Sequence, residues 1–178
     1  RRRLGSSIGD ASSVALGDFD DDGDLDLMLL APDGPAQIWI NDLLWNWRRE
    51  TWCRPIETSG PTEAVWFRDD DDGTPQLATL VGTGADRRLA IWSLQRDAVR
   101  EVEIAEENRT VPGARGLAAI DLAGSGRTNL LLTRDDDTAG PSLEVRDARG
   151  GMIESIESIE AIEVPEAIAA DLAQFRTH

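Results

Sequence analysis

The chain has 178 residues and a formal net charge of −16, from 34 acidic and 18 basic side chains. So acidic a surface repels nucleic-acid phosphates and anionic lipid, and no apolar run approaches the ~18 residues that a membrane span needs. The single cysteine, Cys53, and the single histidine, His178, leave no intrachain disulfide, no cysteine-based zinc site and almost no basis for Ser-His-Asp or Cys-His catalysis.

A strand–loop–strand pattern recurs along the chain. Three copies occur, at residues 13–29, 64–80 and 117–132. The aligned glycines lie 50 and then 53 residues apart, at Gly23, Gly73 and Gly126. Residues 169–173 echo residues 119–123 at the same offset of 50, so a fourth copy is expected to start there and to be cut short.

Each copy opens a longer repeat in which about four short β-type runs are separated by Gly- and Pro-containing turns. In the first repeat the predicted strands are residues 14–17, 25–31, 36–41 and 45–53. In the second they are residues 63–67, 76–81, 88–94 and 99–104. In the third they are residues 116–122, 129–133, 142–147 and 152–159, with the acidic run 135–137 as a solvated turn.

Four strands in ~40–50 residues, repeated, are typical of β-propeller blades. We therefore predict an all-β fold, a β-propeller fragment with about three four-stranded blades plus the start of a fourth. The chain would form one partial domain. Its predicted blades cover about residues 11–58, 61–109 and 113–160, and the fourth begins at about 164–178.

Two features allow a second interpretation. The six tryptophans, at positions 39, 45, 47, 52, 66 and 92, lie on or beside the predicted strands and are expected to pack between blades. The clustering of Trp45, Trp47 and Trp52 leaves a sugar-binding platform open as the alternative. In residues 153–160 isoleucine recurs every three positions, as in a helix, but the repeat register favours an outer strand.

The first repeat carries the pattern of a calcium loop between two strands. Aspartates occupy alternate positions, at Asp18, Asp20, Asp22, Asp24 and Asp26. Calcium takes six to eight hard oxygen ligands, and Gly23 permits the sharp bend that turns alternate side chains inward. A carbonyl near Asp24 and the carboxylate of Asp26 can complete the shell. An EF-hand is excluded because position twelve is Leu29, not Glu, and both flanks are predicted strands.

The later copies have lost several of these acids. In the second, Arg68 and Gln76 replace the first and last ligands, and Arg68 supplies an internal positive charge. In the third, Ala123 and Ser125 replace the middle ligands and Arg127 intrudes. We expect neither loop to bind calcium well.

Residues 15–27 resemble the FG-GAP/VCBS repeat family, the blades of integrin alpha-like propellers. The resemblance implies that the loop joins a blade's first and second strands. It also implies that Asp18, Asp20, Asp22 and Asp26 bind calcium through their side chains and that Asp24 does so through its carbonyl. Members are mostly secreted, periplasmic or surface-exposed, and complete ones have about seven blades. Further blades are therefore expected outside this sequence.

The expected function is a non-enzymatic calcium-binding module for protein–protein interaction, adhesion or scaffolding of a larger assembly. Its partners would be other protein subunits or further propeller blades, with no nucleic acid and no direct membrane insertion. The alternative is the propeller domain of a secreted carbohydrate-active enzyme or carbohydrate-binding protein. The sequence offers no convincing acid/base pair for that chemistry, because turns and metal binding account for the aspartates.

Overall fold

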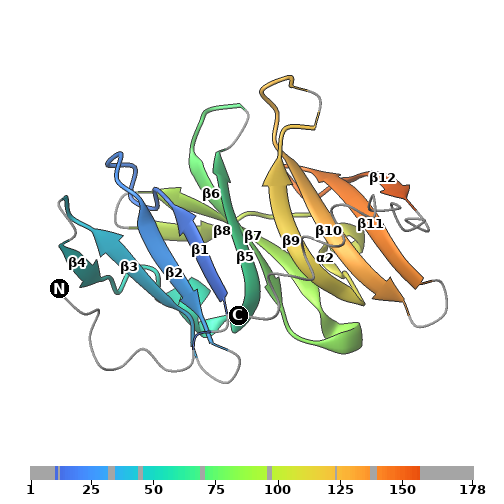
Figure 1. Ribbon diagram of the computed structural model, residues 1–178, viewed down its shortest axis with the longest axis horizontal. Helices are drawn as coiled ribbons and strands as arrows, with labels where there is room; N and C mark the ends of the chain where they lie inside the picture. Colours follow the sequence, from blue (N-terminus) through green and yellow to red (C-terminus); the bar gives the residue numbers. More distant parts are fainter. Residues whose placement is uncertain are drawn as a thin grey trace, which may run out of the picture.

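The computed structural model describes residues 11, 13–31, 35–43, 46–68, 71–95, 98–122, 124–136 and 140–156. These residues form three four-stranded antiparallel sheets, each an up-and-down meander in chain order. Figure 1 shows the three sheets side by side along the longest axis of the molecule. The described chain is therefore all-β with three repeated sheets, as the sequence predicts. The predicted start of a fourth repeat, at about 164–178, lies outside the described residues.

The first sheet consists of β1 (Ser13–Gly17), β2 (Asp26–Leu30), β3 (Gln37–Asn41) and β4 (Trp47–Arg49). The second consists of β5 (Pro61–Arg68), β6 (Pro75–Val81), β7 (Arg88–Gln95) and β8 (Ala98–Glu101). The third consists of β9 (Ala114–Ile120), β10 (Asn129–Asp136), β11 (Gly140–Asp147) and β12 (Met152–Ile156). Short helical turns are α1 (Arg54–Thr58), η1 (Gly84–Asp86) and α2 (Glu106–Arg109). None of them is long and apolar enough to cross a membrane.

The second sheet is covered on both faces, and its sequence reflects this. β6 is buried at every position, whereas β2 alternates between buried and half-buried residues because, within the described part of the chain, a sheet packs on only one face of the first sheet. One apolar core lies between the first and second sheets and includes Met28, Ile38 and Leu77. Another lies between the second and third sheets and includes Leu80, Ile91 and Leu130. The first strands of the sheets are neighbours, since β5 contacts both β1 and β9.

The contact between β1 and β5 requires a residue without a side chain. A Cβ atom on Gly17 would lie 2.2 Å from Trp66 Cγ, far inside van der Waals contact. Gly17 thus lets the Trp66 ring pack directly on the β1 backbone. The indole Nε1 then donates a hydrogen bond of 3.1 Å to the Asp18 carbonyl. This packing fixes the end of β1, where the aspartate loop begins.

We expect Gly17→Ala to lower the free energy of unfolding by about 1–3 kcal/mol, because the added methyl overlaps Trp66 and pushes β1 and β5 apart. Urea unfolding followed by circular dichroism measures the change. Val14→Ala, at an exposed position of the same strand, is the control and should cost less than about 1 kcal/mol. An unchanged midpoint for Gly17→Ala would show that these strands do not meet as described.

The strand predicted at residues 45–53 is wrong in its extent. β4 covers only Trp47–Arg49, and the chain then turns into α1, where Pro55 occupies the first turn. Proline lacks the N–H that a ladder needs but suits a helix start. The buried Glu57 carboxylate holds α1 on the first sheet, accepting a 3.0 Å hydrogen bond from the Ile38 N–H and pairing with Arg49.

Other strand boundaries also differ from the prediction, most clearly at the ends of β8 and β10. β8 ends at Glu101, and Ile104 is buried in the second core without being in a strand. The acidic run predicted as a turn is partly strand, because β10 continues through Asp136. Asp135 is opposite Pro141 of β11, its N–H donates to the Gly113 carbonyl, and Arg115 offsets its charge at 3.3 Å. Asp137 and residues 157–159 lie outside the described residues.

The tryptophans support packing more than a sugar platform. Trp92 is buried in the first core, and Trp52 and Trp66 pack against it. Trp45, which the platform interpretation needs, lies outside the described residues.

Candidate metal centre

The loop of residues 18–26 joins β1 to β2 and is shaped by its own first residue. The Asp18 carboxylate accepts hydrogen bonds from the backbone N–H groups of Asp22, at 3.0 Å, and Gly23, at 3.2 Å. The turn uses left-handed backbone at Asp21 (φ 60°) and at Gly23 (φ 91°). Glycine adopts this region without strain, and aspartate tolerates it better than most residues. These two hydrogen bonds and the two left-handed residues define the tight turn.

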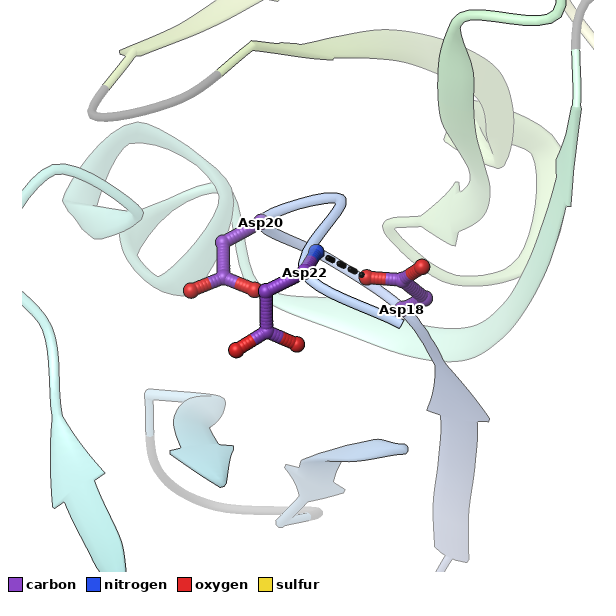
Figure 2. A group of neighbouring side chains, drawn as sticks. All are labelled: Asp18, Asp20 and Asp22. Carbon is purple, nitrogen blue, oxygen red and sulfur yellow. Dashed lines mark hydrogen bonds between the residues drawn. The ribbon is translucent and has the colours of Figure 1, made fainter. Parts of the chain in front are cut away.

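Three of the five predicted ligands come together in this loop. Asp18, Asp20 and Asp22 each offer a carboxylate oxygen, and these oxygens lie within 4.8 Å of one another. Figure 2 shows the three side chains on the loop, with the Asp22 backbone N–H donating to Asp18. No second group of this kind occurs among the residues that the structure describes.

One oxygen in this group lacks a partner. Asp20 Oδ1 is buried and has no hydrogen-bond partner among the described residues. A buried anionic oxygen without a donor is costly, and a bound cation, a water or a proton would satisfy it. Hard carboxylate oxygens are the ligands that Ca²⁺ and Mg²⁺ prefer. The three residues therefore fit a hard divalent cation.

The other two predicted ligands hold the loop onto the first sheet. Asp26 is fully buried, and its two oxygens accept hydrogen bonds from the backbone N–H groups of Phe19, at 2.7 Å, and Asn41, at 2.8 Å. Asp24 accepts a 3.0 Å hydrogen bond from the Leu43 N–H. Both carboxylates thus engage the backbone. The predicted metal contacts of the Asp26 carboxylate and the Asp24 carbonyl stay predictions.

Burial, with some help from neighbouring negative charge, raises the pKa of two carboxylates at the loop, Asp20 and Asp26. Burial is the main cause that raises the pKa of Asp26 to about 6; the hydrogen bonds from Asn41 and Phe19 oppose the rise, and the charges of Asp20 and Asp22 add to it. Burial and the Asp22 charge likewise raise the pKa of Asp20 above its ordinary range. A divalent cation would oppose both shifts, since it stabilises the ionised form.

Two arginines supply positive charge to the loop. Arg48 on β4 lies 3.6 Å from Asp20 Oδ2 and pairs more closely with Asp42, at 2.6 Å. Arg68, at the end of β5, reaches from the second sheet to Asp18 and Asp21. From the sequence alone, the Arg68 charge is expected to act within the loop of the second repeat, and no role is expected for Arg48. Neither partnership is visible in the repeat pattern, because each joins residues from different strands or sheets.

The loop of residues 121–129 in the third sheet has the same backbone hydrogen bonds but lacks the acids at the third and fifth positions. Asp121 accepts hydrogen bonds from the N–H groups of Ser125 and Gly126, as Asp18 does from Asp22 and Gly23. The first position of the repeat thus shapes the loop. Asn129, which aligns with Asp26, likewise accepts from the Leu122 N–H at 3.4 Å. The side chains at the third and fifth positions are free to differ, and in the third repeat they are not acids.

A cavity of about 620 Å³ opens beside the loop of residues 18–26. Asp20, Asp21 and Asp22 line one side, and residues at the start of β6 and the end of β7, including Pro75 and Leu94, line the other. The loop is thus accessible from the groove between the first and second sheets.

Comparisons with known proteins do not identify a family for this chain. A scan against models of protein families finds none that matches the chain. A search of curated proteins finds no significantly similar sequence. The fold and the loop geometry therefore carry the functional proposal.

Proposed function

We propose that the chain is a calcium-binding β-propeller module of the FG-GAP/VCBS type that acts in protein–protein interaction, adhesion or scaffolding. The observation that carries the proposal is the Asp18, Asp20 and Asp22 cluster with its unpartnered Asp20 oxygen. It lies on a loop between the first two strands of a four-stranded sheet. That is the position in which the family resemblance places calcium.

The arrangement of the sheets supports the propeller part of the proposal. Successive meanders pack face to face, and their first strands are adjacent. The uncovered face of the first sheet carries Val14 and Leu16, each 53% exposed. Apolar residues on an open sheet face are suited to contact with another sheet. Further blades or another subunit would cover this face, and the module would be secreted, periplasmic or on the cell surface.

In this proposal the cation is a brace, not a catalyst. Asp18, Asp20 and Asp22 would hold it, and its charge would neutralise carboxylates that otherwise repel one another. Asp26 would keep the loop fixed to β3 through the Asn41 N–H. The module would then present a rigid edge to a partner and carry out no reaction.

Calorimetric titration with calcium tests the metal site. We expect one dominant site with Kd in the ~10⁻⁴–10⁻³ M class of extracellular modules. Asp22→Asn should abolish it, because the amide has no negative charge but can still accept the Asp24 N–H that Asp22 now binds. Asp72→Asn is the matched control, since Asp72 is the aligned residue of the second repeat and accepts the Thr74 N–H in the same way.

The control should leave calcium binding unchanged. Two or more equal sites, or binding that survives Asp22→Asn, would contradict the assignment to this loop. Absence of any calcium binding in the parent chain would contradict the proposal itself.

A carbohydrate-binding role remains the second candidate on one observation. Trp39 and Trp47 are half-buried on the adjacent strands β3 and β4, and the β3–β4 register places them on one face of the sheet. Half-exposed aromatic rings on one face of a sheet suit stacking against sugars. Binding on a glycan array that is lost in Trp39→Ala would favour this role.

A further inference from the structure

Arg68 ties the second sheet to the loop of the first. Its Nη2 lies 2.9 Å from Asp21 Oδ1 and 3.3 Å from Asp18 Oδ2, across a sequence separation of about 50 residues. Its Nη1 donates to the Gly73 carbonyl at 3.0 Å, and the guanidinium lies over the Trp66 ring, 5.4 Å from its centre. The side chain is thus held on three sides with its charge directed at the loop.

Trp66 adds a second link to the same aspartate. Its indole N–H donates to the Asp18 carbonyl while Arg68 pairs with the Asp18 carboxylate. Asp18 is therefore held by the second sheet at both its backbone and its side chain. Because Asp18 also shapes the loop through the Asp22 and Gly23 N–H groups, the second sheet bears directly on the metal centre.

We propose that Arg68 is a built-in competitor of the divalent cation: its guanidinium occupies the Asp18 side of the site, stabilises the calcium-free loop and lowers calcium affinity. This inference rests on the proposed calcium function. In the second repeat Arg68 stands where Asp18 and Asp121 stand in the other two repeats. The second repeat thus has, in place of a ligand, a cationic side chain that pairs with Asp18 and Asp21 of the loop in the first repeat.

The charges favour competition over cooperation. Asp18 Oδ2 already accepts two donors, the Gly23 N–H and Arg68, and a cation bound there would displace the second. A guanidinium left within a few ångströms of Ca²⁺ would repel it even in a solvent-like environment. Arg48 is a weaker competitor, since it lies 3.6 Å from Asp20 and closer to Asp42.

The test compares the 178-residue chain with Arg68→Gln, Arg68→Lys and the control Arg88→Gln. Arg88 is a half-exposed arginine of the same sheet that pairs with Glu101 instead of the loop. Calcium affinity is measured by calorimetry, and the melting temperature is measured in chelator. We expect Arg68→Gln to bind calcium on the order of tenfold more tightly and to melt at a lower temperature without calcium.

Arg68→Lys keeps the positive charge but loses the planar guanidinium, so its calcium affinity should lie between those of the parent chain and Arg68→Gln. Arg88→Gln should match the parent in affinity. A purely structural role for Arg68 predicts the opposite sign, because a loosened loop would bind calcium more weakly.

The outcomes separate this inference from the proposed function. If the parent chain binds calcium and Arg68→Gln binds it equally or more weakly, the competitor role is overturned and the calcium function stands. If only Arg68→Gln binds calcium, the competitor role is supported and the calcium function of the parent chain fails. If neither binds, both are overturned.

Discussion

Calcium is expected to raise the melting temperature of the chain by roughly 5–10 °C at a hundredfold excess over Kd. A ligand that binds only the folded state adds RT ln(1 + [L]/Kd), about 2.7 kcal/mol at that excess, and a domain of this size shifts by roughly 2–4 °C per kcal/mol. In the proposed site the binding energy would come from the Asp18, Asp20 and Asp22 oxygens, which lie within 4.8 Å of one another. Scanning calorimetry in calcium and in chelator measures the shift.

The rise in melting temperature caused by calcium should become larger as pH increases from about 4 to 7. Without calcium, the pKa of Asp26 is raised from 3.8 to about 6, and that of Asp20 is raised as well. Between pH 3.8 and about pH 6 the folded chain therefore binds more protons than the unfolded chain. The stability that Asp26 contributes is fully present below 3.8 and is lost as pH rises through about 6. Calcium needs ionised carboxylates, so its benefit has the opposite pH dependence.

Asp72→Asn again serves as the control and should keep the calcium shift, whereas Asp22→Asn should remove it. Magnesium at the same concentration should give a smaller shift, because it demands octahedral geometry and gives up water reluctantly. A melting temperature that calcium leaves unchanged at pH 7 would overturn the bracing role. So would a shift that is larger at pH 4 than at pH 7.

Residues with a fixed place in the repeat were predictable from the sequence. Gly23 and the aligned Gly73 and Gly126 all have positive φ, so the repeat alignment located the three turns. The strands on either side followed from alternating or continuous apolar runs, as in β2 and β6. The acids at 18, 20 and 22 were identified by spacing alone, because a tight loop brings alternate side chains together.

Roles that depend on contacts between distant strands were not predictable. Asp26 fits the ligand spacing, yet its two oxygens bind the N–H groups of Phe19 and Asn41. The second of these lies on β3, so no local pattern reveals it. Arg68 contacts Asp21 only because β5 packs beside β1. Similarly, α1 depends on Pro55 and on the buried Glu57. The strand-like pattern that begins near Trp47 continues into this segment, so the sequence predicts a strand there instead of a helix.

A second group of buried charges lies outside the loop of residues 18–26, in the third sheet. Arg146 is 2% exposed and Glu144 is 4% exposed, and they pair on β11 at 2.6 Å. Arg146 Nη1 also donates to the carbonyls of Asn108, at 2.5 Å, and Gly150, at 2.8 Å. Arg134 pairs with the other Glu144 oxygen at 2.7 Å. The network thus joins the α2 segment, which follows the second sheet, to the β11–β12 turn.

Arg146→Ala should therefore lower the free energy of unfolding by about 2–4 kcal/mol, because it removes one of the two arginines that pair with the buried Glu144 carboxylate and deprives the Asn108 and Gly150 carbonyls of a donor. Urea unfolding measures the loss, and Arg149→Ala is the control. Arg149 lies three residues on, is largely exposed and pairs with Asp71, so its removal should cost less than about 1 kcal/mol.

The double variant Glu144→Leu with Arg146→Met separates the cost of breaking a buried ion pair from the loss of the hydrogen bonds to the Asn108 and Gly150 carbonyls. Removing both buried charges spares their desolvation, so the double variant should be more stable than Arg146→Ala alone. It should still be less stable than the parent chain, because the Asn108 and Gly150 carbonyls lose Arg146 in either case. If the double variant is as unstable as the single one, the anchoring hydrogen bonds account for the whole effect. If Arg146→Ala costs no more than Arg149→Ala, the network does not hold α2 to the third sheet.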